Sequence, residues 1–293
     1  MGPSRAAVRS ARRVFSTADY RQVLQQGNCA RLEDAIAELR VDLRLGVSAT
    51  REDVVAGAWR WLLKHRRDDA ALRSLFLSRS ERNPLTIQGN DFAFEMKAGG
   101  AVVDFACLAP GHEEGVEIKS QYDSASRVAF QIAQYRRVLP RVSIVGDATD
   151  WRRLRRLADE FGLGLLVLES HSAARHLVRV LEAPLHENNL DVSALVGLLR
   201  IGELSQVVAD VTGRELVAGR TKLFGEAVAL CRSSGLPTTY VMRAVLDQIA
   251  RRRQLSARTV ERRVPAPLRS IVATIDPREA DLPVLRGWLD AEV

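Results

Sequence analysis

The hydrophobic pattern between residues 92 and 168 changes its period several times, and this order of periods constrains the fold more than any other feature. Alternating polarity is typical of strands, and three- or four-residue spacing is typical of helices. The expected elements are, in chain order, strands at residues 92–97, 101–108 and 115–120, a helix at 124–137, a strand at 142–145, a helix at 150–161 and a strand at 164–168. This order predicts an α/β core whose last strands are parallel and buried.

Helical periodicity precedes and follows this core. Thr50, with Asp53 three places later, indicates the start of a helix over residues 51–64. Beyond residue 190 the spacing is again helical. We therefore expect three regions, which are a helical N-terminal region with a basic arm over residues 1–82, the α/β core over residues 83–185, and a helical C-terminal module over residues 186–293 that is a candidate for DNA binding.

Composition excludes several classes of protein. The 293 residues are 46% hydrophobic and 27% charged, which is typical of a globular chain. No apolar run approaches the roughly 20 residues of a membrane-spanning helix, so no membrane partner is expected. The three cysteines lie far apart without a CxxC pair, which predicts neither disulfides nor a zinc site and favours a cytoplasmic location.

The net charge of +7 is unevenly distributed. Residues 1–90 carry 16 basic and 10 acidic side chains, whereas residues 91–190 carry 12 and 14. Basic residues gather again near the C-terminus, where a cluster suits a phosphate backbone. The candidate nucleic-acid-binding residues are Arg251, Arg252, Arg253, Arg262 and Arg263. A solvated helix face without a nucleic-acid partner explains such a cluster equally well.

The candidate chemistry lies on the second and third expected strands. Glu117 and Lys119 are two residues apart on a strand, so they project to the same side, and Asp104 joins them if the two strands pair. Two close carboxylates attract a hard divalent cation, and the adjoining lysine offers a positive charge to a phosphate or an attacking water. The alternative is a cross-strand ion pair of Asp104 with Lys119, but the other residues of its strand are apolar, which makes an unpaired Asp104 costly.

Asp104 and the run Glu117-Ile118-Lys119 resemble the motif of the PD-(D/E)xK nuclease superfamily, and Gln131-x-x-x-Tyr135 on the following helix is similar to the QxxxY element of its RecB-like branch. The resemblance implies a restriction-endonuclease-like mixed-sheet core flanked by helical regions. It also implies a metal-dependent nuclease that uses Mg²⁺ or Mn²⁺ and acts on nucleic acid, with DNA favoured over RNA. A homodimer is left open.

The resemblance also implies a role for each site residue. Asp104 and Glu117 would hold the metal, with the Ile118 carbonyl contributing, and Lys119 would orient or deprotonate the attacking water. Gln131 and Tyr135 would contact the metal shell or the DNA backbone. Glu95 corresponds to an additional acidic ligand, and a turn centred on Ala98-Gly99 would pair position 95 with position 102 on the face of Asp104.

Two other readings stay open. An upstream helical acid, which some branches of the superfamily supply, is not identifiable here, and Glu52 is only a candidate for it. A missing ligand would leave a nuclease-fold protein that binds nucleic acid or a regulatory partner without cleaving. The other reading is an ion-paired α/β domain of purely structural use.

Overall fold

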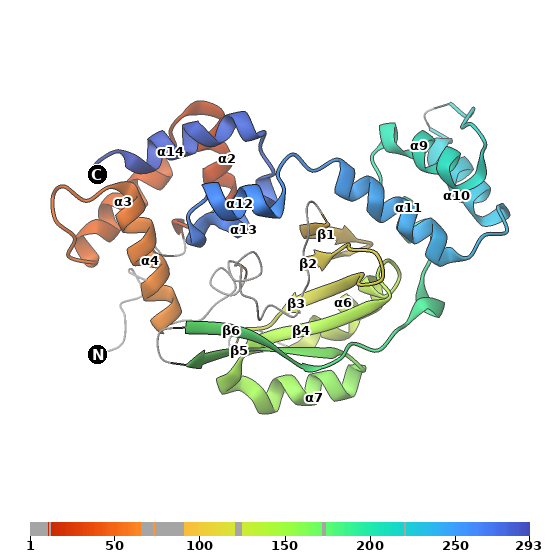
Figure 1. The fold of residues 1–293 in the computed structure, drawn as a ribbon, viewed down its shortest axis with the longest axis horizontal. Coiled ribbons are helices and arrows are strands. Elements are labelled where there is room, and N and C mark those ends of the chain that lie inside the picture. Colours follow the sequence, from red (N-terminus) through yellow and green to blue (C-terminus); the bar gives the residue numbers. More distant parts are fainter. Residues whose placement is uncertain are drawn as a thin grey trace. The chain divides into compact units, whose positions relative to one another are not determined.

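The computed structural model describes residues 11, 13–65, 73, 91–120, 125–171, 174–219 and 221–293. The chain divides into two compact units (Figure 1). Residues 84–253 form one, called here the sheet unit, and residues 1–83 together with 254–293 form the other, called the helical unit. The boundary expected near residue 83 separates the two units. The C-terminal module expected at residues 186–293 is instead divided between them.

A six-stranded mixed sheet is the centre of the sheet unit. Its strands are β1 (Phe92–Ala98), β2 (Ala101–Cys107), β3 (Glu114–Ile118), β4 (Arg141–Asp147), β5 (Gly164–His171) and β6 (Ala174–Leu181), and they lie in the sheet in chain order. The pairs β3–β4 and β4–β5 are parallel, and the other three pairs are antiparallel. The expected α/β class, the first five strands and the parallel pairing are confirmed.

Strand β6 was not predicted from the sequence, because its charged residues hide the polarity pattern. One of them, Arg179, forms a two-pronged ion pair with Glu114 of β3, with nitrogen–oxygen distances of 3.0 and 2.8 Å. The Ser143 hydroxyl of β4 donates to the same carboxylate. The ion pair of Arg179 with Glu114 holds β6 at the sheet edge, because breaking it would leave a buried charge without compensation.

Two helices connect the parallel strands. After a 3-10 turn at Ala125–Arg127, α6 (Val128–Tyr135) joins β3 to β4. After a second one at Ala148–Asp150, α7 (Trp151–Phe161) joins β4 to β5. Ser124, the expected cap of the first helix, lies outside the described residues. Apolar residues of both helices share one hydrophobic cluster with the sheet. Helices α6 and α7 therefore cover the same sheet face.

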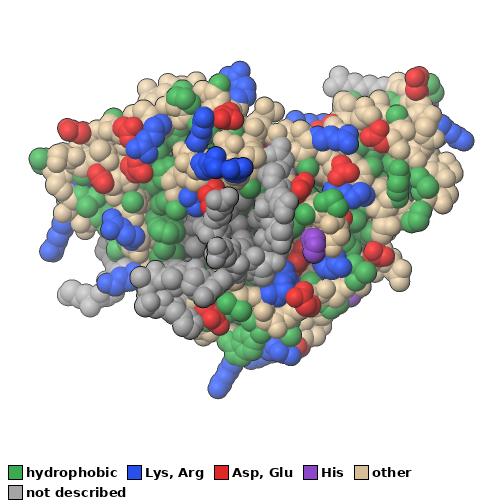
Figure 2. Space-filling model, viewed as in Figure 1, with side chains coloured by type: hydrophobic (Ala, Val, Ile, Leu, Met, Phe, Trp, Pro, Cys, Tyr) green, Lys and Arg blue, Asp and Glu red, His purple; other side chains and the backbone are tan. Residues whose placement is uncertain are grey.

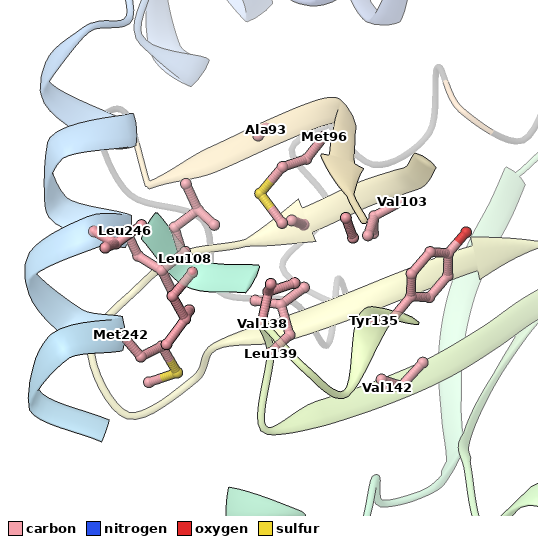
Figure 3. Close-up of a cluster of buried hydrophobic side chains, with 14 of the residues drawn as sticks. Ala93, Met96, Val103, Leu108, Tyr135, Val138, Leu139, Val142, Met242 and Leu246 are labelled. Carbon is pink, nitrogen blue, oxygen red and sulfur yellow. The ribbon is translucent and has the colours of Figure 1, made fainter. Parts of the chain in front are cut away.

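The side chains of the β1–β2 hairpin change from one face of the sheet to the other halfway along its length. Ala93 and Met96 of β1 both belong to the cluster under α6, although residues three apart on a regular strand face opposite sides. Figure 3 shows both side chains. The change of face coincides with Glu95, whose φ of 50° lies in the left-handed region. Ala98 pairs with Ala101 and Lys97 with Val102, so the expected pairing of position 95 with position 102 is wrong.

The C-terminal part of the sheet unit is helical, as expected. After a 3-10 turn at Glu187–Asn189 it contains α8 (Val192–Val196), α9 (Ile201–Thr212), α10 (Leu223–Ser233) and α11 (Thr238–Arg251). Met242 and Leu246 of α11 lie against Leu108 beside the hairpin (Figure 3). The Arg243 guanidinium of α11 also donates hydrogen bonds to the Glu113 carboxylate, at 2.7 Å, and to the Leu108 carbonyl, at 2.9 Å. These helices therefore share the core of the sheet.

The helical unit brings the two ends of the chain together. Its elements are α2 (Thr17–Gln26), α3 (Ala30–Asp42), α4 (Arg51–His65), α12 (Ala257–Arg263), a 3-10 turn at Ala266–Leu268, α13 (Arg269–Ile275), another at Glu279–Asp281, and α14 (Leu282–Asp290). The predicted cap of α4 is confirmed, because Thr50 and Asp53 exchange hydrogen bonds of 2.9 to 3.2 Å. The Trp288 indole of α14 donates to Glu33 of α3 at 2.8 Å. Among the described residues, no helix combines the length and the apolar character needed to cross a membrane.

Candidate functional site

Glu117 and Lys119 form a buried ion pair near the end of β3. The Lys119 Nζ lies 2.9 Å from Glu117 Oε1, and the two side chains are 6% and 4% exposed. Both residues point towards α6, as their two-residue spacing predicts. Neither charge has much access to water, so the pair depends on the groups that surround it.

Helix α6 supplies those groups. Gln131 Nε2 donates to Glu117 Oε1 at 2.7 Å, and Gln131 Oε1 accepts from Lys119 Nζ at 3.1 Å, which fixes the orientation of the amide. The Tyr135 hydroxyl, one helical turn further on, lies 2.5 Å from Glu117 Oε2. Four residues singled out in the sequence are thus brought together, and we call Glu117, Lys119, Gln131 and Tyr135 the glutamate cluster.

The Tyr135 hydroxyl has two acceptors for one hydrogen. It lies 2.5 Å from the Val102 carbonyl oxygen as well as from Glu117 Oε2. Burial, and then the charge of the nearby Glu117, raises the pKa of Tyr135 well above its ordinary value, so the phenol is neutral at physiological pH. When the hydrogen goes to the Val102 carbonyl, Glu117 Oε2 is a buried acceptor that another positive group could satisfy.

Asp104 lies on β2, the strand next to the one that carries Glu117. Strands β2 and β3 pair Phe105 with Val116, and the same register continued by one residue places Asp104 opposite Glu117. Asp104 Oδ2 accepts from the Ile118 backbone N–H at 2.8 Å, and the side chain is half-buried. Asp104 and Glu117 thus lie on neighbouring strands, and Asp104 is hydrogen-bonded to the main chain of Ile118, the residue that follows Glu117.

Glu95, the third acid expected at the site, lies on β1. Glu95 is exposed and stands opposite Asp104 in the continued β1–β2 register. Within the described part of the chain, no group of three or more His, Cys, Asp or Glu side chains is arranged to hold a metal ion. Glu52, the candidate upstream acid, belongs to the helical unit and forms an ion pair with Arg286 at 2.8 Å.

The arginines expected to bind nucleic acid are divided between the two units. The division between the two units falls after Arg253, so three of the five belong to the sheet unit and two to the helical unit. Most have partners, which are Asp210 for Arg251, Glu203 for Arg252, the Phe92 ring for Arg253 and Glu279 for Arg263. On the face shown in Figure 2, basic and acidic side chains intermingle.

Two features beside the site were missed by sequence reasoning. Arg153 of α7 donates to the carbonyl of Ser120, the residue that follows Lys119, at 2.7 Å. A Cβ added to Gly146 would lie 2.6 Å from the Lys119 carbonyl oxygen, so glycine permits the close approach of β4 to this point. The basic run Trp151-Arg-Arg-Leu-Arg-Arg156 in the predicted helix was the available signal for the contact of Arg153, whereas the backbone approach at Gly146 has no signal in the sequence.

The family model described as bacteriophage P4 protein cII matches residues 72–263, about two thirds of the chain. The matched span contains the whole sheet unit described above, including the glutamate cluster and Asp104. No curated protein and no solved structure matches the chain.

Proposed function

The chain belongs to the bacteriophage P4 protein cII family, and we propose that it is a divalent-metal-dependent nuclease of the PD-(D/E)xK type with a restriction-endonuclease-like core. The observation that carries the proposal is the glutamate cluster with Asp104 opposite it. Three side chains selected by their likeness to a nuclease motif, those of Lys119, Gln131 and Tyr135, contact the buried Glu117 carboxylate, and Asp104 accepts a hydrogen bond from the backbone of the residue after Glu117. DNA is the favoured substrate. The three free cysteines support a cytoplasmic site of action.

The donor set suits Mg²⁺ or Mn²⁺. Mg²⁺ is commonly held by one or two carboxylates and keeps several waters, so the pair Asp104 and Glu117 suffices. The backbone carbonyl of Ile118 is a further oxygen beside them. The hydroxyl of Tyr135, with one hydrogen between two oxygens, indicates that Glu117 can accept another positive partner. When bound, the cation would supply positive charge next to the scissile phosphate.

The residues of the chain then have distinct roles. Lys119 places an ammonium beside Glu117, where it can orient a water molecule and stabilise the charge that develops on a phosphate oxygen. Gln131 holds both partners through its two amide atoms, which makes it a positioning residue. The hydroxyl of Tyr135 lies between Glu117 Oε2 and the Val102 carbonyl of β2, and the phenol stays neutral.

The test is a cleavage assay with the full chain on supercoiled plasmid, single-stranded DNA and RNA, each with Mg²⁺, Mn²⁺ or EDTA. We expect metal-dependent cutting of DNA that falls at least about 100-fold in Asp104→Asn and Lys119→Met, because a positioned catalytic group typically contributes this much. Lys97→Met is the matched control, since it removes an exposed lysine of β1. Cutting in EDTA, or equal cutting by wild type and Lys119→Met, would refute the proposal.

A second candidate function is nucleic-acid binding without turnover. It is favoured by one observation, which is that no group of three or more His, Cys, Asp or Glu side chains among the described residues is arranged to hold a metal ion. This candidate predicts salt-sensitive binding that is unaffected by Mg²⁺ and survives Asp104→Asn. The same assay separates the two, because wild-type protein would then bind DNA tightly and leave it intact.

A further inference from the structure

Helix α7 presents two exposed arginines for which the described part of the chain provides no ion-pair partner. Arg152 and Arg156, one helical turn apart, are both exposed, and neither guanidinium takes part in an ion pair or hydrogen bond with the residues that the structure describes. By contrast, Arg155 between them pairs with Asp159 at 2.9 Å. The opposite side of the helix packs into the core through its apolar residues. One face of α7 therefore carries two arginines without an ion-pair partner among the described residues, together with the exposed Asp159 and Glu160.

An exposed tryptophan begins this helix. Trp151 is 37% exposed, whereas the chain contains only four tryptophans and is 5% aromatic. Large apolar side chains are normally buried, and an indole beside free guanidiniums offers a flat surface on which a base can stack. We call Trp151, Arg152 and Arg156 the α7 surface.

The first turn of α7 is hydrogen-bonded to the chain segment that follows the candidate catalytic residue Lys119. Arg153, in the same helical turn, donates to the Ser120 carbonyl at 2.7 Å and also pairs with Asp150 at 2.5 Å. Ser120 follows Lys119 directly, and the Lys119 N–H donates to Val145 of β4, from which the chain leads into α7. The start of α7 is thus tied to the strand end that carries the glutamate cluster.

The placement of Arg152 is unfavourable for the helix itself. It lies in the first turn of α7, where the helix dipole is positive, and that turn contains no acidic residue. A cation there costs helix stability, so an anionic ligand would gain from the guanidinium and from the dipole together. Phosphate groups are the anions that the adjoining nuclease-like site would meet.

We propose that the α7 surface binds a single strand of nucleic acid next to the glutamate cluster, with phosphates on Arg152 and Arg156 and a base stacked on Trp151. This inference rests on the proposed function for its choice of ligand, but it concerns binding and can be tested without cleavage. It differs from the expectation that the C-terminal arginines grip the backbone. Those arginines mostly have acidic or aromatic partners, whereas Arg152 and Arg156 have none among the described residues.

The experiment measures the fluorescence anisotropy of a labelled oligothymidylate as the full chain is added, in EDTA and over a range of KCl concentrations. The oligonucleotide is longer than the sites of about 4–16 nucleotides that single-strand-binding folds occupy. Each phosphate contact contributes a slope of about 0.7 in log K against log salt for single strands. The double variant Arg152→Ala/Arg156→Ala should therefore flatten the slope by about 1.4 and weaken binding about 25-fold at 0.1 M salt. Trp151→Ala should weaken binding about 5- to 140-fold.

The matched control is Arg21→Ala/Arg258→Ala, which removes one exposed arginine of α2 and one of α12 and therefore the same total charge. It should bind like wild type. The proposal is overturned if the α7 double variant keeps the wild-type affinity and slope, if the control loses as much, or if wild type binds no nucleic acid. Tighter binding of a duplex of the same length would overturn the single-strand assignment. A thermal melt of each variant confirms that the fold is kept.

The outcomes also distinguish this surface from the nuclease proposal. Loss of binding in Arg152→Ala/Arg156→Ala, with no cutting by wild type in Mg²⁺, would support the α7 surface and refute catalysis. Normal binding by that variant, with metal-dependent cutting by wild type, would refute the α7 surface and support catalysis.

Discussion

Replacing Lys119 with methionine removes the ammonium from a carboxylate that has almost no contact with water. At the 2.9 Å separation of Lys119 Nζ and Glu117 Oε1, the Coulomb attraction is about 6 kcal/mol with an effective dielectric constant of about 20. Most of this offsets the cost of burying the two charges. Breaking one partner of such a pair typically costs about 3–5 kcal/mol, and we expect Lys119→Met to lower the free energy of unfolding by that amount.

The double variant Glu117→Gln/Lys119→Met removes both charges and should recover most of this loss, since neutral buried pairs of similar size are often as stable as the ion pair. Hydrogen exchange of β3 backbone amides, followed by mass spectrometry, measures the opening free energy of the sheet unit separately from the helical unit. Lys97→Met, on the exposed side of β1, should stay within about 0.5 kcal/mol of wild type. The reasoning is refuted if Lys119→Met matches wild type, or if the double variant is no more stable than the single one.

Three further perturbations test other parts of the structure. At Glu95, whose φ is 50°, glycine should be more stable than alanine by about 1 kcal/mol in urea unfolding, and alanine would be the better residue if the strand were regular there. Gly146→Ala should cost about 1–3 kcal/mol, because its Cβ would meet the Lys119 carbonyl, whereas Gly202→Ala has open space around it and should not destabilise the protein in a thermal melt. Burial raises the pKa of Tyr135, as it does that of Tyr20, so absorbance at alkaline pH should show these two phenols ionising only with unfolding. Because the folded-state pKa is the higher one, the stability contributed by each phenol is present below the ordinary value near 10 and is lost as the pH rises above it.

The sequence predicted those parts of the fold that depend on local periodicity. The hairpin, β3 and the following helix, strand, helix and strand could be read because their polarity repeats every two or about every 3.6 residues. Strand β6 could not, since Arg179 faces inward and is compensated by Glu114, 65 positions away in the chain. The pairing of the two chain ends is equally invisible to local patterns, because it depends on contacts such as that of Trp288 with Glu33.

The candidate site was predictable to the extent that strand and helix spacing fix direction. Glu117 and Lys119 share a face because they are two residues apart on a strand, and Gln131 and Tyr135 share one because they are four apart on a helix. The register of the β1–β2 hairpin was not predictable from the glycines alone. The turn occupies Gly99 and Gly100 rather than Ala98 and Gly99, and this shift moves Glu95 opposite Asp104.

The position of Glu95 connects the shape of the hairpin with the acidic pair. Its left-handed backbone lets the hairpin change face at the level of Asp104, so that the tip packs under α6 while the base turns Phe94 and Phe105 to the other side. Asp104 therefore leaves the regular alternation of β2 and reaches the Ile118 amide beside the glutamate cluster. A residue other than glycine held in this conformation costs about 1–3 kcal/mol and persists where the surrounding structure requires it. If the strain serves to aim Asp104, Glu95→Gly should keep both the hairpin and the activity, whereas Glu95→Val should lower both together.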